Sequence, residues 1–203
     1  MNVMEGVEDI PELVMREGVP WNWQSFPEYL DVLESRAFDL DVATQIPHAP
    51  LRVFVMGERA LGREPATPAD IAAMQAIVRE AVSAGALGFS TSRSLNHKAS
   101  DGTITPSYAA ASDELAGIAC GLTPDGTGVL QFISDFDDID GEFAIVRRMA
   151  RESGRPLPVL RLKHLLNMLE RNPQHAQAFA AVIGAIWRDM RAVGLFSDVG
   201  FAP

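Results

Sequence analysis

The stretch Gly85-Ala86-Leu87-Gly88-Phe89-Ser90-Thr91-Ser92 decides the fold class that the sequence predicts. A helix is expected before it, because Thr67 can cap the free N–H groups of a first turn, Pro68 fits the first helical position, and apolar side chains recur at helical spacing as far as Val82. Gly85 suits the left-handed residue that ends a helix. No loop separates this end from the next apolar run, so the pattern predicts a helix that leads directly into a buried strand, which stops at a cluster of hydroxyl groups.

The same order of helix and strand returns along the chain. Helices are expected over 105–121, 140–154 and 172–194, and each is followed by an apolar run expected to be a strand, over 128–133, 157–162 and 195–201. This spacing is typical of repeated βα units. Continuous apolar strands between helices indicate a parallel sheet covered on both faces, so the sequence predicts an α/β fold.

The connections between these elements differ in length. Links from helix to strand are short and contain glycine, whereas links from strand to helix are long, notably over 47–66 and 93–105. In parallel α/β folds, sites lie at the carboxyl ends of the strands, on the loops from strand to helix. The sequence therefore points to that edge of the sheet as the functional one, and the alternative is that these long loops are surface decoration.

Composition limits the class of protein. The 203 residues are expected to form a single α/β domain over 1–203 with a substantial core. A net charge of −10 argues against nucleic acid or an anionic membrane as a partner. The single cysteine, Cys120, excludes an internal disulfide and fits a reducing compartment, and we interpret it as a small buried hydrophobe. No apolar run approaches the ~20 residues of a membrane span and no signal peptide is visible, so a cytoplasmic location is expected.

The first half of the chain supplies several candidates for a site. Short helices are expected over 11–17 and from Tyr29 onward, and the aromatic residues of 21–26 either line a ligand pocket or, in the favoured interpretation, pack under a loop. A strand is expected over 39–46. At its end, His48 is either an acid, base or ligand or a brace for the turn. Arg52 could bind a substrate carboxylate, or pair with Glu58 or Glu64.

Several stretches, in order, carry a resemblance to a known family. They are Glu5 to Pro11, Trp21 to Trp23, Pro47 to Arg52 with Val55 to Gly57, Arg63 to Thr67, and Ala84 to Ser92. This set, spread over roughly residues 4 to 160, resembles the N-acyl-D-amino-acid deacylase branch of the amidohydrolase superfamily. The resemblance implies part of a (β/α)8 TIM-barrel-like fold, a small-molecule amide substrate and a zinc cofactor. In that family the metal polarises the amide carbonyl and activates water.

The chain departs from the family pattern at the metal ligands. The family has a His-x-His pair on its first strand and a further ligand on its second, and both strands are expected to be missing here. The strand over 128–135 has no histidine where the family has one. His164 lies close to a further ligand position, but Arg161 or Lys163 fits the register better, and the family's catalytic aspartate would lie beyond Pro203. No metal ligand is therefore assigned in this chain.

Other motifs are weak. Gly88 to Ser92 resembles a nucleophile elbow, but Ser92 stands where a second glycine is required, which disfavours a serine hydrolase. Aspartates at 135, 137, 138 and 140 lack the spacing of a calcium loop and are interpreted as a solvated loop with a helix cap. A nucleotide-binding domain is ranked last, because no glycine-rich phosphate motif follows a strand.

Two hypotheses about function remain. In the first, the chain is an amidohydrolase acting on amides such as N-acyl-D-amino acids, with activity doubtful in this chain alone. Its pocket would be built from His48, Arg52, Ser90, Ser92, Asn96 and His97. In the second, the chain is a non-catalytic, truncated barrel segment with open sheet edges that needs a partner or the missing strands. Association with further copies, as a homo-oligomer, is considered under both.

Overall fold

Three parallel strands form the sheet at the centre of the described residues, which are 2–122, 128–135 and 137–155 of a computed structural model. The strands are β1 (Gln45–Pro47), β2 (Gly88–Arg93) and β3 (Val129–Ser134), in the order β1-β2-β3. Ile46 pairs with Phe89, which pairs with Leu130. The helices between the strands make each connection a βα unit. The predicted α/β class with parallel strands is therefore confirmed.

The helix α6 (Pro68–Ser83) forms as the sequence predicts. The Thr67 side chain accepts a hydrogen bond from the backbone N–H of Asp70, and the Asp70 carboxylate accepts one from the backbone N–H of Thr67. Arg59 pairs with the same carboxylate, and this hydrogen bond is the largest of the causes that hold the pKa of Asp70 far below its usual value. The strand begins at Gly88 and not at Ala86. A Cβ at residue 88 would collide with the backbone of Val129, and the residue has φ +154°, so this position requires glycine.

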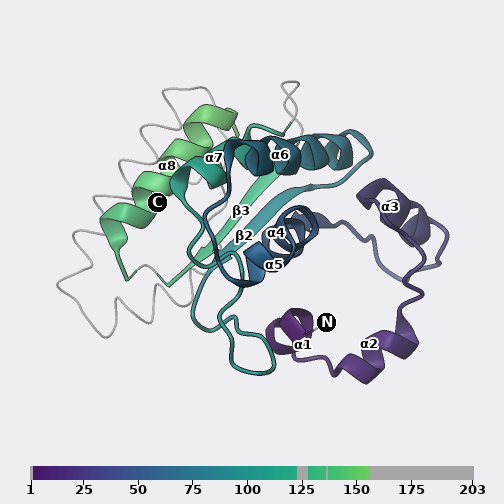
Figure 1. The fold of residues 1–203 in the computed structure, drawn as a ribbon. Helices are drawn as coiled ribbons and strands as arrows, with labels where there is room; N and C mark the ends of the chain where they lie inside the picture. The colour runs from purple at the N-terminus through teal and green to yellow at the C-terminus, as the bar shows by residue number, and fades with distance from the viewer. Residues whose placement is uncertain (1, 123–127, 136, 156–203) are drawn as a thin grey trace, which may run out of the picture.

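The two faces of the sheet differ in burial. Alternate residues of a strand point to opposite faces, and one face carries the fully buried Phe89, Leu130 and Phe132. Figure 1 shows α6, α7 (Ser112–Ala119) and α8 (Ile139–Ser153) side by side along β2 and β3. The opposite face, with Ser90 and Ser92, is only half-buried. We call these the covered face and the half-exposed face.

The N-terminal helices lie away from these three. The helices α1 (Asn2–Glu8), α2 (Glu12–Gly18) and α3 (Phe26–Glu34) form an arc, seen in purple in Figure 1. The predicted helices near 11–17 and 29–33 are thus confirmed. The α3 side chains Phe26 and Leu30 pack against the core. Four aromatic rings contact one another in series, with Trp21 on Trp23, Trp23 on Tyr29, and Tyr29 on Phe26.

Three local predictions were wrong. The segment 47–66 is not a loop, because α4 (His48–Met56) and α5 (Glu58–Leu61) occupy it. Pro50 lies in the first turn of α4, where backbone N–H groups have no partner within the helix. A proline is therefore tolerated there, and in this segment it marks the start of a helix and not a loop. The strand expected over 39–46 is limited to 45–47, since residues 39–43 are exposed. The helix expected from 105 begins only at Ser112, because 105–111 form turns.

The remaining predicted elements are either confirmed or fall outside the described residues. The helix α8 ends at Gly154, which has the left-handed φ of +66°, and the Asp138 side chain caps its start by accepting from the backbone N–H of Gly141. The helix expected over 172–194 and the strands expected over 157–162 and 195–201 lie outside the described residues. Within the described ranges, no helix has the length and apolar character needed to cross a membrane.

Candidate functional site

The six candidate residues lie in β2 or in the segments that follow β1 and β2. His48 is the first residue of α4, directly after β1, and Arg52 lies one turn later. Ser90 and Ser92 belong to β2. Asn96 and His97 lie in the loop after β2. The structure divides these residues into a buried cluster around His48 and a half-exposed group around Ser92.

The buried cluster links a hydroxyl, an imidazole and a carboxylate. His48 Nε2 lies 2.9 Å from Glu114 Oε1, and His48 Nδ1 lies 2.8 Å from Thr91 Oγ1. Because an ionised carboxylate can only accept hydrogen bonds, Nε2 carries the proton and Nδ1 accepts from the Thr91 hydroxyl. His48 and Glu114 are each 1% exposed. The connectivity is that of a catalytic triad, but in this cluster the hydroxyl is buried.

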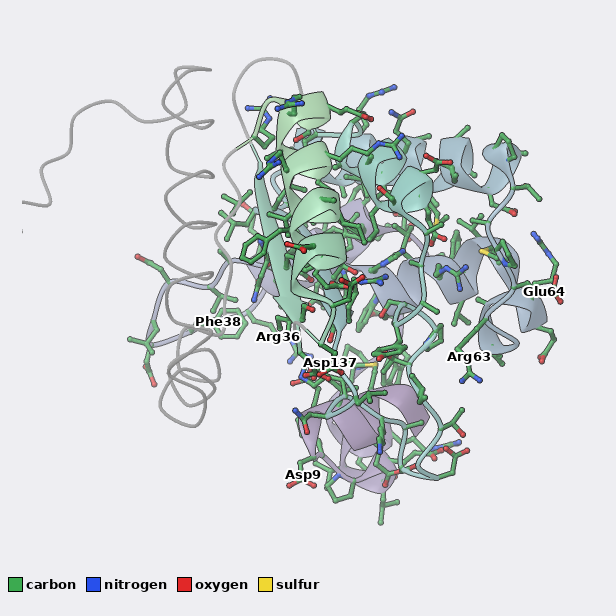
Figure 2. All side chains as sticks on the ribbon, turned by 90° about the vertical axis from the view of Figure 1, so that its left-hand side faces the viewer. Asp9, Arg36, Phe38, Arg63, Glu64 and Asp137 are labelled. Carbon is green, nitrogen blue, oxygen red and sulfur yellow. The ribbon has the colours of Figure 1, made fainter. Side chains whose placement is uncertain are left out.

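Arg52 holds the carboxylate of this cluster. Its Nε donates to Glu114 Oε1 over 2.6 Å, and its two terminal nitrogens donate to the backbone carbonyl oxygens of Pro106 and Glu64 over 2.9 and 2.7 Å. Figure 2 shows the Glu64 side chain pointing away from the molecule, so its carbonyl and not its carboxylate contacts Arg52. All three guanidinium nitrogens are therefore engaged within the chain, and the side chain is 2% exposed.

Burial and the neighbouring charges set the protonation states of the cluster. Burial is the largest influence on the pKa of His48 and lowers it. The charges of Arg52 and Arg93 lower it further and Glu114 opposes them, and the net result is a lowered pKa that favours the neutral imidazole. Burial is the largest single influence on the pKa of Glu114 and raises it, but the hydrogen bonds from His48 and Arg52 together with their charges outweigh it, and the pKa is lowered. The cluster thus holds one ion pair, Arg52 with Glu114, and one neutral histidine. No local pattern indicates Glu114 beyond an acidic residue in the first turn of a helix.

The half-exposed group centres on Ser92 and His97. Ser92 Oγ lies 2.7 Å from His97 Nδ1, and both side chains are half-buried. Ser90 points to the same half-exposed face of β2 and is also half-buried. Asn96 is exposed, and its backbone N–H donates to Ser94 Oγ over 3.2 Å. This group is therefore only partly buried, in contrast to the buried cluster.

Asp135, at the end of β3, fixes the start of the loop after β2. Its carboxylate accepts from Ser94 Oγ and from the backbone N–H of Leu95, each over 2.6 Å. The sequence pattern predicts that Asp135 belongs to a solvated acidic loop, and it does not indicate this contact. The helix cap expected in that loop is confirmed at Asp138, and Asp137 and Asp140 are exposed as expected.

The structure also bears on the resemblance to a nucleophile elbow and on Cys120. The stretch from Gly88 to Ser92 runs straight within β2, so it forms no sharp turn of the nucleophile-elbow kind. Cys120 lies at the C-terminal end of α7 and is half-buried, and burial raises the pKa of its thiol. A raised pKa is typical of an unreactive cysteine.

The described residues do not fit a catalytic metal. Across 2–122, 128–135 and 137–155, no three His, Cys, Asp or Glu side chains are grouped so that they could hold an ion. Both ring nitrogens of His48 are already hydrogen-bonded, and a catalytic zinc needs three protein ligands. His164 and His175 lie outside the described residues. We therefore derive no chemical step from a metal in this part of the chain.

Comparison with known proteins gives a partial match. No protein-family model matches the chain. Over 78 residues it is 33% identical to a D-aminoacylase of Alcaligenes xylosoxydans xylosoxydans, a match that covers 38% of this chain and 16% of that protein. It also resembles a crystal structure of D-aminoacylase described as defining a novel subset of amidohydrolases, with a TM-score of 0.54, 26% identity, and coverage of 66% of this chain and 26% of that one.

A second solved D-aminoacylase, from a study of its binuclear metal centre, matches with a TM-score of 0.54 and 25% identity. That match covers 72% of this chain and 31% of the other. A D-aminoacylase mutant in complex with copper chloride gives the same TM-score. The chain therefore spans less than a third of the length of each of these relatives.

Proposed function

We propose that this chain, which is related over part of its length to the D-aminoacylase branch of the amidohydrolase superfamily, acts in the hydrolysis of small-molecule amides such as N-acyl-D-amino acids. In this proposal residues 1–203 form a single α/β domain that corresponds to the central portion of a (β/α)8 barrel. The parallel β1-β2-β3 sheet with its intervening helices supports the assignment. So does the family resemblance of the sequence, which the partial matches to D-aminoacylases confirm.

The observation that carries the proposal is where the polar groups gather. The half-exposed group and the buried cluster both lie at the carboxyl ends of the strands or directly beyond them. This is the edge at which barrels of this kind place their sites. Among the described residues, the covered face is lined mainly by apolar side chains, so it offers no comparable surface for a polar substrate.

The two groups have different roles in this proposal. Ser90, Ser92, Asn96 and His97 line the substrate pocket, because they are at least partly open to solvent and can hydrogen-bond an amide or a carboxylate. His48 and Arg52 are positioning residues. They tie α4 to β2 and to the start of α7 through Thr91 and Glu114, and thereby fix the strand ends that carry the pocket.

The only support for a metal in this proposal comes from the D-aminoacylases that the chain resembles. One of the solved D-aminoacylases is described by its binuclear metal centre. We propose zinc as the metal of the complete site, held by ligands other than the described residues. The D-aminoacylases are named as enzymes, which does not favour the alternative of a non-catalytic segment. A homo-oligomer and a cytoplasmic location stay predictions.

The test is metal-dependent, stereoselective turnover by the purified chain. N-acetyl-D-methionine and its L-enantiomer are incubated with the chelator-treated and the zinc-loaded protein, and free methionine is quantified by chiral chromatography. The proposal predicts release from the D-enantiomer that a chelator abolishes and zinc restores, together with bound zinc in the protein. Equal rates on both enantiomers, or no zinc uptake and no turnover, would contradict it.

A further inference from the structure

The structure places a serine and a histidine in hydrogen-bond contact at the open edge of the sheet. Ser92 Oγ and His97 Nδ1 are 2.7 Å apart, which is the spacing of a nucleophile and its general base. Ser92 lies near the carboxyl end of β2, on the half-exposed face. The side chain is half-buried there, so it is not enclosed by the core.

The neighbouring residue Thr91 makes a similar contact with a histidine, but its hydroxyl is buried. Thr91 also contacts a histidine, over 2.8 Å, and that histidine contacts a carboxylate. Thr91 points to the covered face, where it is 3% exposed, and no substrate can approach its hydroxyl. Two adjacent hydroxyl–imidazole pairs thus stand on opposite faces of one strand, and of the two only the pair of Ser92 is partly exposed.

The backbone around the accessible pair is held in place. The Ser92 carbonyl oxygen accepts from Ser107 Oγ over 3.0 Å. The loop then turns back through a hydrogen bond from the His97 backbone N–H to the Ser94 carbonyl, and Asp135 fixes its start. A catalytic pair needs such support, because small losses of geometry cost much of the rate.

We propose that Ser92 and His97 form a nucleophile and general base that hydrolyse activated esters through an acyl-serine, an activity separate from the proposed metal-dependent amide hydrolysis. His97 Nδ1 takes the Ser92 proton as Oγ bonds to the acyl carbon. The bond from that carbon to the leaving oxygen breaks, and the leaving group departs with the electron pair and a proton from His97. Water then attacks the acyl-serine, gives a proton to Nδ1, and Ser92 Oγ recovers its proton from His97 as the acid is released.

The experiment uses p-nitrophenyl acetate as the probe, the full chain, and EDTA in every reaction. We expect a burst of p-nitrophenolate, and an acetyl group on Ser92 after acid quench and peptide mass spectrometry. Ser92→Ala and His97→Gln should each lower the rate by about 100-fold, the range of a lost general base. The rise of the rate with pH as the histidine deprotonates should disappear in His97→Gln. Ser83→Ala, at the exposed end of α6, is the matched control and should keep the wild-type rate.

Two outcomes overturn the proposal. Acetyl found on other residues and not on Ser92, or a Ser92→Ala variant with the wild-type rate, shows that the serine is no nucleophile. Acetyl trapping is done on the wild type, so it decides the question even where a variant does not fold. Because chelator is present throughout, failure here leaves the zinc-dependent turnover of N-acetyl-D-methionine untouched, and the reverse also holds.

Discussion

Thr91 and Ser92 are neighbours in one strand, and each hydroxyl meets an imidazole at nearly the same distance, 2.8 and 2.7 Å. The Thr91 pair belongs to the buried cluster, in which an arginine and a glutamate complete the contacts. The two side chains of the Ser92 pair are half-buried. The same polar chemistry therefore occurs fully buried on one face of β2 and half-buried on the other.

The largest effect is expected from Glu114→Ala. This change removes the carboxylate that Arg52 and His48 share and leaves a buried guanidinium without its counter-ion. Breaking a buried pair from one side costs about 3–5 kcal/mol of unfolding free energy. Urea unfolding followed by circular dichroism measures it, with the exposed Glu58→Ala as the control. A loss below about 1 kcal/mol would mean that the cluster contributes little to the fold.

A pair of smaller changes compares the two faces directly. Thr91→Val keeps the shape of the side chain but leaves His48 Nδ1 buried without a donor, at a cost of about 1–3 kcal/mol. Ser92→Ala should cost no more than about 0.5 kcal/mol, since water can replace the lost hydroxyl at a half-exposed site. Equal losses in the two variants, measured in the same unfolding assay, would remove the distinction between the faces.

The pH dependence of stability gives the smallest expected effect. Burial lowers the pKa of His48 in the folded chain, against the opposing effect of Glu114 and together with the charges of Arg52 and Arg93. The unfolded chain therefore binds more protons, and the stability due to neutral His48 is present above its unfolded pKa of 6.5 and falls as the pH drops below it.

Comparison of the wild type with His48→Gln isolates this contribution from the other histidines. Between pH 7.5 and pH 5.5, the wild type should lose more unfolding free energy than the variant. Glu114, whose pKa is also lowered, contributes in a separate window, below its usual 4.5. If the variant has the same slope as the wild type across this range, His48 is not held neutral by burial.

Local signals in the sequence were enough to predict the helices whose ends carry capping residues or glycine. Thr67-Pro68 and the glycine after Ala84 gave α6, and Gly154 gave the end of α8. The helix α4 was missed because Pro47 and Pro50 flank its start, and prolines mark turns and helix starts alike. Residues 39–44 read as a strand from their alternation, yet Asp39 to Ala43 are exposed and lie outside the sheet.

The sequence pattern named candidate residues for a site, but not the contacts between them. His48, Ser92 and His97 were named because strand ends carry sites. Which of them contact each other depends on side-chain direction and on partners far along the chain. Glu114 lies 66 residues from His48, and no local pattern joins the two. The sequence also could not show that all three guanidinium nitrogens of Arg52 donate to groups within the chain, because two of the acceptors are backbone carbonyl oxygens.

Modification of the histidines by diethyl pyrocarbonate tests the contrast between the two faces most directly. The folded chain is treated at neutral pH, and the label on each histidine is quantified over time by peptide mass spectrometry. Because His97 is half-exposed and His48 is 1% exposed, the account predicts that His97 is labelled while His48 stays protected until the chain is unfolded in urea. Labelling of His48 in the folded chain as fast as that of His97 would contradict it.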